Sequence, residues 1–555
     1  MFIFIGFATF FSGLNSPFQN DDSYQIVNNT PVHSISNLPS FFGSSTFFNG
    51  EKLTGVYYRP LMTATFSIIY SFFGSNPFFY HFFQLSLYIA AAFVLFLVFK
   101  HFFKQPTALF LSLIFLVHPL NSQIVYSIPT MQDALFFFLG ILAIWMLIKN
   151  KSLWKVVLLL FLSMLSKESG ILFTLIASLY LYLFDRKRIF AFFKTIAVPI
   201  VLYFVLKISA VGFTGAHHAA PINELGFIEK MMTAPSIMLF YIGKLLFPAQ
   251  LSLGYYWTYP NFSVEHVLIP LLIDLGVIGL FTYLGFVVKK RLSKKSFLTF
   301  MFFATWTVMG IGLYLQVIPG LDFTACETWF YFAMAGLLGM IGVSTLLVKQ
   351  FRYRNWLIVP IVLIIIALGI RSNLRGYDYS SQYKLATVDV SVTDNNFSAM
   401  NNIAQNLIDQ GKYNEAIVYA EKSIQIYPIV SNYINLGVAL QQTGKYKEAI
   451  DAYDKALIYG NINIIYENIA LIHIVSSKPA DTEQFFKTAF AEYPRDFKLW
   501  LYYAVFEGAV GSKDTAINAI ISARNYGQVP SQIYDGITNG IPFTVPILGQ
   551  NVLVK

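Results

Sequence analysis

Long apolar runs separated by short polar connections dominate the first 371 residues of the chain. Most of these runs approach the roughly 20 residues that an α-helix needs to cross the hydrocarbon core of a bilayer. They predict membrane spans near residues 78–99, 106–124, 134–148, 154–166, 170–184, 189–210, 268–288, 297–318, 331–348 and 356–371. With a further apolar run at residues 1–14, the pattern predicts an all-α, polytopic helix bundle of about eleven spans over residues 1–375.

The run at residues 1–14 differs from a cleaved signal peptide, because no basic segment precedes it and no small-residue cleavage site follows it. It is also shorter than a full span, which favours a start of the protein upstream of Met1. Composition agrees with a membrane protein: 56% of the residues are hydrophobic and 12% are charged, whereas soluble domains average about 25% charged residues.

Positive charge collects in alternate connections between the predicted spans. Sixteen lysines and arginines occupy one set of connections, against about five in the other set. The sixteen are Lys100, Lys104, Lys149, Lys151, Lys155, Arg186, Lys187, Arg188, Lys289, Lys290, Arg291, Lys294, Lys295, Lys349, Arg352 and Arg354. Because cytoplasmic loops carry an excess of lysine and arginine, the first set is predicted to face the cytoplasm. Topology thus explains the net charge of +9, which does not indicate a nucleic-acid partner.

Residues 230–250 form another apolar stretch, but counting it as a span would move the basic run 289–295 to the opposite side. The stretch also contains Pro235, Lys244 and Pro248, which are unfavourable in a lipid-facing helix. We therefore predict a re-entrant or interfacial segment on the outer side. The same extracytoplasmic face then carries the first loop (17–77), the 118–133 connection, the 211–267 region, the 319–330 loop and everything after Arg371.

The apolar runs stop near residue 395, where a repeat begins. The sequence GKYNEAI at Gly411–Ile417 returns 33 residues later as GKYKEAI at Gly444–Ile450. This spacing, with small residues where two helices cross, is typical of tetratricopeptide (TPR) repeats, whose period is about 34 residues. Matching positions predict a solenoid of about four repeats over residues 395–527, enough to bury a continuous core. We expect residues 528–555, which contain Gly and Pro, to form an extended tail.

A TPR solenoid commonly binds a polypeptide in its groove. The repeats therefore predict a protein partner or an acceptor protein, and the alternative is a solenoid that merely caps the molecule. The repeat pattern alone names no partner.

Two adjacent carboxylates, Asp21 and Asp22, follow the first apolar run in a chain that is poor in charge. Carboxylates at a membrane surface serve as a general base, as metal ligands, or simply as solvated loop residues. Residue type does not choose among these three roles.

Other polar side chains stand at the ends of predicted spans on the same face. Arg59 is a single cation within an apolar, aromatic stretch, and the 118–133 connection begins with His118 and ends with Asp133. Lys167 and Glu168 occupy a tight hairpin between two short apolar runs. A charge at membrane depth costs at least about 2.5–3.5 kcal/mol, so such residues usually form pairs or have a function. A Lys167–Glu168 ion pair is the structural alternative here.

These residues belong to an ordered set of short motifs. The set comprises Asp21-Asp22 followed by Ile26 and Asn28, Tyr58-Arg59-Pro60-Leu61, Asn76-Pro77-Phe78-x-x-His81, His118-Pro119, Ser166-Lys167-Glu168-x-Gly170, and Pro248-x-x-Leu251-Ser252 before an aromatic run. In order and spacing it resembles the transmembrane and TPR-containing protein O-mannosyltransferases of the GT-C superfamily, which use polyprenyl-phosphate-linked sugars. The resemblance covers nearly the whole membrane portion, and the repeats follow where that family has them.

Three positions depart from the family pattern. Gln123 stands where the family usually has a glutamate, and Met131 replaces an arginine near Asp133. Glu327 matches an external Glu-Arg-aromatic motif, but Thr328 occupies the position of its arginine. These departures indicate either a different donor head group or a loss of activity.

The resemblance implies an inverting transfer of a sugar, mannose in this family, from a polyprenyl-phosphate donor to a Ser or Thr hydroxyl of an extracytoplasmic protein. A hydroxyl attacks poorly unless a base takes its proton, and Asp21 or Asp22 is the predicted base. Arg59, and after it Lys167, is predicted to stabilise the phosphate of the leaving group. Candidates for orienting the donor or the acceptor are His118, Glu327, Glu168 and Asp133.

We expect no cofactor beyond the lipid-linked sugar donor. A monophosphate leaving group does not demand a metal and no ligand cluster is apparent, so we expect no metal requirement either. The single cysteine, Cys326, excludes an intrachain disulfide and a multi-cysteine metal site. The other expected partners are an acceptor protein and membrane lipids. The expected location is a membrane, the plasma membrane if the source is prokaryotic, with the active site and the TPR domain outside the cytoplasm.

Two other functions compete with the transferase. One is a catalytically degenerate, membrane-anchored TPR scaffold that recruits extracytoplasmic proteins. The other is a transporter, which would carry ionisable residues near mid-bilayer and broken helices in matching halves. Here the charged residues lie at span ends on one face and the two halves show no repeat, which disfavours the transporter.

Overall fold

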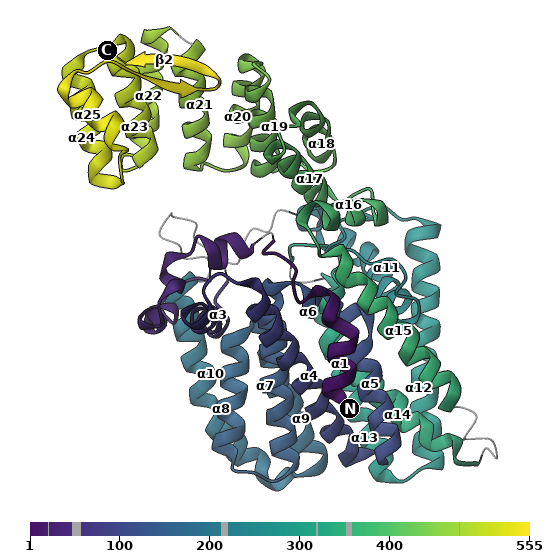
Figure 1. Ribbon diagram of the computed structural model, residues 1–555. Coiled ribbons are helices and arrows are strands. Elements are labelled where there is room, and N and C mark those ends of the chain that lie inside the picture. Colours follow the sequence, from purple (N-terminus) through teal and green to yellow (C-terminus); the bar gives the residue numbers. More distant parts are fainter. Residues whose placement is uncertain are drawn as a thin grey trace. The chain divides into compact units, whose positions relative to one another are not determined.

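A computed structural model describes residues 1–19, 21–46, 57–212, 220–317, 320–350, 358–476 and 478–554, without the side chains of 348–350. The chain forms two compact units, Met1–Thr393 and Asp394–Lys555 (Figure 1). Both are helical, and the described residues contain a single two-stranded sheet. The predicted all-α fold class is confirmed.

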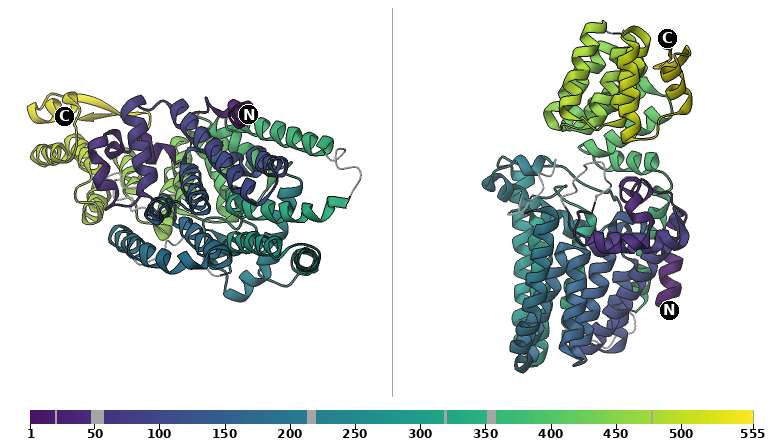
Figure 2. Two further views of the ribbon diagram at one scale, coloured as in Figure 1. Left: turned by 90° about the horizontal axis from the view of Figure 1, so that it is seen from below. Right: turned by 90° about the vertical axis from the view of Figure 1, so that its left-hand side faces the viewer.

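Apolar helices form the body of the first unit and run side by side (Figure 2). Within the described part of the chain, seven helices, counted with adjoining turns, are long and apolar enough to cross a bilayer. They are α4 (Pro77–Phe102), α7 (Met131–Ile148), α10 (Ile189–Val211), α12 (Ile269–Arg291), α13 (Lys294–Gly312), α14 (Tyr331–Ser344) and α15 (Ile358–Asp378). An eighth span arises if α5 (Gln105–Val117) and α6 (Ser122–Tyr126), which meet at a bend of 52°, count as one.

Three predicted spans are shorter apolar helices, α1 (Phe2–Phe10), α8 (Leu153–Ser166) and α9 (Ile171–Phe184). They pack on the long helices: α8 on α7 and α10, α9 on α7 and α13, and α1 on α4 and α15. Every apolar run of the sequence therefore corresponds to a helix, while the number of membrane crossings stays a prediction. Parts of the predicted segments that lie outside the described residues are 20, 47–56, 213–219, 318–319, 356–357, 477, 555, Arg352 and Arg354.

The predicted first loop contains a helix that the apolar pattern does not single out. This helix, α3 (Pro60–Phe73), starts at a proline whose fixed φ suits the first helical turn, and it buries Met62 and Phe66. Shorter elements precede it, namely η2 (Ser23–Val27), η3 (Thr30–His33), η4 (Ile35–Asn37) and α2 (Leu38–Phe41). Ile26 and Val32 join Met62 and Phe66 in one buried cluster that also includes Tyr80 of α4 and Leu135 of α7, so the loop is a folded segment packed on these helices.

The segment predicted as re-entrant or interfacial is one continuous helix, α11 (Phe227–Leu246), with Pro235 inside it. It is absent from the helices of the described chain that are long and apolar enough to span a bilayer. Its placement at the membrane surface stays a prediction.

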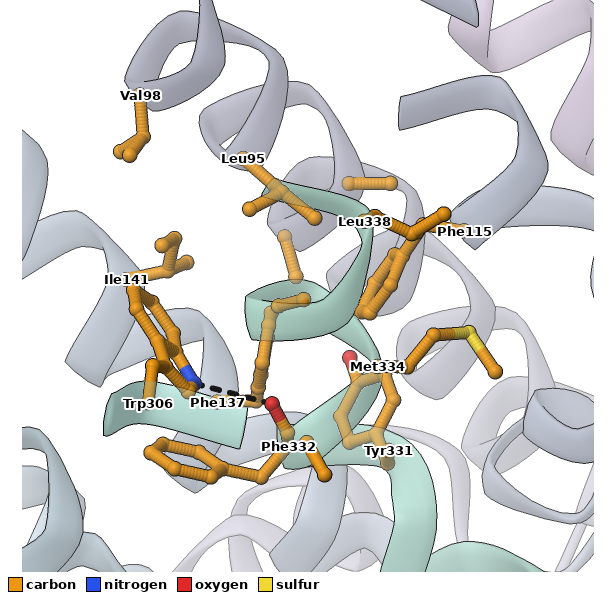
Figure 3. Packing of buried hydrophobic residues seen from close by; sticks show 14 of the residues in the cluster. Leu95, Val98, Phe115, Phe137, Ile141, Trp306, Tyr331, Phe332, Met334 and Leu338 are labelled. Carbon is orange, nitrogen blue, oxygen red and sulfur yellow. Dashed lines mark hydrogen bonds between the residues drawn. The ribbon is translucent and has the colours of Figure 1, made fainter. Parts of the chain in front are cut away.

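Aromatic packing at the centre of the first unit holds α14 against α7 and α13 (Figure 3). The rings of Phe137 on α7 and Tyr331 on α14 have centroids 4.4 Å apart, and Trp306 on α13 donates from Nε1 to a backbone carbonyl of α14 at 3.0 Å. A Cβ at Gly339 would lie 2.2 Å from an aromatic ring of α13, so this glycine permits the close approach of the two helices. The packing positions η12 (Glu327–Phe330), which leads directly into α14.

The second unit is a solenoid of antiparallel helix pairs. The four pairs are α17 (Phe397–Asp409) with α18 (Tyr413–Ile426), α19 (Val430–Gln442) with α20 (Tyr446–Tyr459), α21 (Asn463–Ser476) with α22 (Pro479–Glu492), and α23 (Phe497–Val510) with α24 (Lys513–Tyr526). Gly411 and Gly444 have φ of 74° and 78° where α17 and α19 end, which explains why glycine recurs there. The predicted TPR solenoid is confirmed.

Residues after 528 are folded and do not form the extended tail expected from their Gly and Pro content. They form α25 (Ser531–Asn539) and an antiparallel hairpin of β1 (Phe543–Ile547) and β2 (Gln550–Val554). Leu548 and Gly549 make the turn with φ of 49° and 74°, a pair of positive values that suits a two-residue hairpin. Alternating apolar residues in β1 give the hairpin one face to bury, which a composition-based expectation overlooks.

Candidate active site

The two adjacent carboxylates of the first loop have different surroundings. Asp22 is 3% exposed, and its Oδ2 accepts from the backbone N–H of Gln19 at 2.7 Å. Gln19 is in turn tied by its side-chain amide to the carbonyl of Tyr379. Asp21 has an exposed side chain and its backbone carbonyl begins the turn that follows, accepting from the N–H of Gln25 at 2.9 Å. Asp22 therefore shapes the loop, whereas Asp21 is accessible for chemistry.

Asp21 lies close enough to Arg59 and Asp322 for both charges to affect its carboxyl group. Surrounding protein atoms raise the pKa of the Asp21 carboxyl above its usual 3.8, nearby Asp322 raises it further, and Arg59 opposes both effects. The Asp21 side chain is nevertheless solvent-exposed. A carboxylate with a raised pKa has increased basicity, and exposure leaves it accessible to a substrate hydroxyl.

Arg59 is held just before α3 by three neighbours. Its backbone N–H donates to Thr46 Oγ1 at 3.1 Å, and its guanidinium lies 3.8 Å from the centroid of the Tyr57 ring. Its Nε donates to Glu168 Oε2 at 3.3 Å. Tyr57 donates its hydroxyl to the carboxylate of Asp322. Burial and the negative charges nearby raise the pKa of Tyr57, so its phenol stays protonated and remains the donor.

We name Asp21, Tyr57, Arg59, Glu168 and Asp322 the carboxylate–arginine cluster. Its members come from three segments that are far apart in the sequence: the first loop, the α8–α9 connection and the 319–330 loop. Burial alone would raise the pKa of Glu168, but Arg59 and two lysines outweigh it and lower that pKa, so the pair carries opposite charges. The cluster thus combines an accessible base with a fixed cation.

Lys167 and Glu168 do not form the ion pair considered from the sequence. Lys167 Nζ lies 2.6 Å from Asp133 Oδ1, and both side chains are at most 10% exposed. Glu168 pairs instead with Arg59. Two candidate donor-binding residues, Lys167 and Asp133, are therefore joined in a buried pair beside the carboxylate–arginine cluster, which favours a structural role for both.

His118 uses both ring nitrogens within the protein. Its Nε2 is 3.0 Å from the carbonyl of Leu245 at the end of α11, and its Nδ1 accepts from the N–H of Leu120 at 3.2 Å. With 1% exposure, the ring fastens the bend between α5 and α6 to α11. A substrate-orienting role for His118 stays a prediction that this geometry does not favour.

Glu327 is 1% exposed and accepts two hydrogen bonds, from the Ser252 N–H at 2.9 Å and from the Tyr255 hydroxyl at 3.0 Å. The motif that ends in Ser252 and the motif that contains Glu327 thus meet at this carboxylate. Close by, Arg375 lies 3.0 Å from Asp378 and 3.4 Å from Asp389 of α16 (Gln382–Val392). Glu327 therefore belongs to a second, buried charge network that organises the loops.

Two of the three departures from the family pattern lie together. The thiol of Cys326 is 3.6 Å from Gln123 Oε1 and 3.2 Å from Thr328 Oγ1. A glutamate at 123 and an arginine at 328 would be neighbours of opposite charge, and here both are neutral, so the two changes compensate each other. Met131 is fully buried in an apolar cluster with residues of the first loop such as Ile26.

Sequence reasoning missed Asp322, Tyr57, Arg375 and Asp389. Asp322 shares with Glu327 the predicted outer loop 319–330, so the argument applied to the other isolated charges could have found it. Tyr57 precedes Arg59 by two positions, in the same aromatic stretch of the sequence. Arg375 and Asp389 had no such signal, because their pairing depends on the turn between α15 and α16.

Among the described residues, no group of three or more His, Cys, Asp or Glu side chains is arranged to hold a metal ion. The expectation of a metal-independent reaction stays a prediction.

Comparison with known proteins agrees with this picture of a helical membrane protein that carries TPR repeats. A tetratricopeptide repeat family model matches residues 395–457. The chain is similar to protein O-mannosyl-transferase F38B6.6 of Caenorhabditis elegans, with 26% identity over 436 residues, covering 75% of this chain and 60% of that protein. It is also similar to protein O-mannosyl-transferase TMTC3 of Homo sapiens, with 22% identity over 557 residues, covering 88% of this chain and 60% of that protein.

The resemblance found from the motifs is therefore confirmed: the chain is similar to TPR-containing protein O-mannosyl-transferases. It spans about 60% of the length of these two relatives.

Proposed function

We propose that the protein is a membrane glycosyltransferase of the GT-C type. It moves a sugar, mannose by analogy with the named relatives, from a polyprenyl-phosphate donor to a Ser or Thr hydroxyl of a protein. The observation that carries the proposal is the carboxylate–arginine cluster, in which an exposed carboxylate of raised pKa lies within the electrostatic influence of a fixed guanidinium.

In this mechanism Asp21 acts as the general base. Its carboxylate takes the proton of the acceptor hydroxyl while the hydroxyl oxygen forms a bond to the anomeric carbon of the sugar. The bond from that carbon to the phosphate oxygen breaks, and its electron pair leaves with the polyprenyl phosphate. Attack from the face opposite the leaving group inverts the anomeric configuration.

Arg59 stabilises the charge that develops on the leaving phosphate. Its Nε contacts Glu168, and a guanidinium has four further N–H groups in a planar fork that suits phosphate oxygens. The ring of Tyr57 and the carboxylate of Glu168 hold the group in place before the reaction, so no reorganisation is needed as charge develops.

Arg59→Gln is expected to lower kcat/KM for the lipid-linked donor by about 10²–10³-fold, the loss typical of removing one charge-stabilising donor. Because this change leaves Glu168 without its partner, the double variant Arg59→Gln/Glu168→Gln is the matched comparison. Arg59→Lys keeps the charge without the fork and should retain part of the rate. Transfer at the wild-type rate by Arg59→Gln in purified membranes would remove Arg59 from the mechanism.

We also propose that the end of the bundle carrying the carboxylate–arginine cluster faces away from the cytoplasm, together with the TPR unit. The support is the sixteen basic residues in the alternate connections. Protease added to intact cells is expected to cleave the repeats. If the repeats are cleaved only after the cells are lysed, the repeats face the cytoplasm and the proposed orientation is wrong.

The compensating neutral pair Gln123 and Thr328 supports one alternative, a degenerate relative that acts as a membrane-anchored TPR scaffold. The scaffold requires the repeats but not Asp21. The scaffold function predicts that Asp21→Asn leaves the cellular phenotype unchanged and that removal of the repeats abolishes it.

A further inference from the structure

The C-terminal hairpin lies along the row of helices that begin the repeats. The helices α19, α21 and α23 begin repeats 2, 3 and 4 and pack against one another in sequence. The strand β2 packs on α23, and near the hairpin turn Gln550 donates from Nε2 to the Tyr446 hydroxyl of α20 at 3.4 Å. Figure 1 shows the strands extending from α25 towards α21 and α20. The hairpin therefore reaches from repeat 4 to repeat 2.

The hairpin has one apolar face and one solvent face. On the apolar face, Val554 pairs with Phe543 and Val552 pairs with Val545. Ile547 and Val554 are 5% and 1% exposed, so this face is buried. Leu553 lies on the other face and is 49% exposed.

The solenoid offers this face a matching apolar surface. Leu471, Ile474 and Val475 on α21 pack against the buried cluster that contains Ile547 and Val554. On α23, a Cβ at Gly508 would lie 2.6 Å from Val554, so the missing side chain is what lets the strand rest against the helix. The turn residue Leu548 packs against the buried core of repeats 2 and 3 as well.

The hairpin is an addition to the four helix pairs, and its two most buried residues, Ile547 and Val554, extend the core of repeat 4. A two-stranded hairpin is marginally stable in water, so it depends on the surface beneath it. The repeats also bury alanines such as Ala420 and Ala489 away from the hairpin, between their own helices. Because β1 and β2 follow α25 and lie outside the four helix pairs, they can leave the surface without breaking any connection within those pairs.

We propose that the hairpin is an internal ligand of the TPR groove and that a partner polypeptide binds by displacing it. The partner segment is extended and presents three apolar side chains at alternate positions, as Phe543, Val545 and Ile547 do in β1. This inference rests on the proposal that the repeats bind protein, but it is independent of sugar transfer.

The test uses the full-length protein in lipid nanodiscs and a fluorescent synthetic peptide of residues 541–554 as the probe. The double variant Ile547→Asp/Val554→Asp places charges on the buried face and should release the hairpin. The matched control, Thr544→Asp/Leu553→Asp, places the same charges on the exposed face. Binding is followed by fluorescence anisotropy, and amide hydrogen exchange reports on the strands and on α21 and α23.

The released variant is expected to bind the peptide at least about tenfold more tightly than the wild type or the control. The strand amides should exchange faster, while α21 and α23 keep their protection. Loss of protection in α21 and α23 would show that the hairpin is part of the solenoid core and would overturn the proposal. The proposal would also be overturned if the released variant bound the peptide no more tightly than the wild type. The same holds if the wild-type protein formed dimers that the released variant did not form. Neither readout involves sugar transfer, so a failure of the proposed enzyme activity is a separate result.

Discussion

Asp21→Asn is expected to reduce sugar transfer by about 10²–10⁴-fold, the usual contribution of a general base, without changing abundance or membrane insertion. The side chain is exposed and lies in a loop, so the amide is accommodated without a packing cost. A base works only when deprotonated, so wild-type kcat/KM should be full above the pKa of Asp21 and fall as pH drops through it. Because Asp322 and surrounding protein raise that pKa, this fall should occur above pH 3.8.

Asp22→Asn is the matched control for this experiment. An asparagine keeps an oxygen that accepts from the Gln19 N–H, so the loop should hold and transfer should stay within a few-fold of wild type. The measurement is kcat/KM for the donor across pH in purified membranes. If Asp22→Asn lost most of its transfer activity while Asp21→Asn stayed active, Asp22 would be the base and Asp21 the residue that shapes the loop.

Lys167→Met is expected to destabilise the membrane unit by about 3–5 kcal/mol, because it leaves the buried carboxylate of Asp133 without its partner. Neither side chain is more than 10% exposed, so water cannot take the place of the lysine. The measurement is the fraction of folded protein that survives graded heating in detergent, read by size-exclusion chromatography.

The double variant Lys167→Met/Asp133→Asn removes both charges and should recover most of the lost stability. If Lys167→Met is as stable as the wild type but has lost transfer, the lysine binds the donor phosphate, as the sequence analysis predicted, and its pairing with Asp133 is secondary.

The helices of the first unit were predictable because each apolar run is local and long. The predicted span 189–210 corresponds to α10 (Ile189–Val211), and 78–99 lies within α4 (Pro77–Phe102). The repeats were predictable for a related reason, since spacing alone reveals the turn glycines Gly411 and Gly444. The helix α3 was not predicted, although its 14 residues make it as long as α8 and α9. Its apolar run is interrupted by Thr63, Thr65, Ser67 and Ser71.

Three members of the carboxylate–arginine cluster, Asp21, Arg59 and Glu168, were candidates from the sequence, but their partners were not predictable. Arg59 and Glu168 were each identified as isolated charges, yet they are 109 positions apart, and no local pattern reports that they pair. Tyr57 and Asp322 are 265 positions apart and meet for the same non-local reason. The adjacency of Lys167 and Glu168 suggested a pair, but the turn between α8 and α9 sends the two side chains to different partners.

The most direct test of the account is transfer of labelled sugar by the wild-type protein. Purified membranes that contain it are incubated with radiolabelled polyprenyl-phosphate mannose, and protein is separated from lipid and counted. We predict label that is attached to protein, is released by alkaline β-elimination as expected for a Ser or Thr linkage, and is absent from membranes without the protein. Correctly inserted protein that transfers no label from this donor, or from the same lipid carrying other sugars, would contradict the central claim.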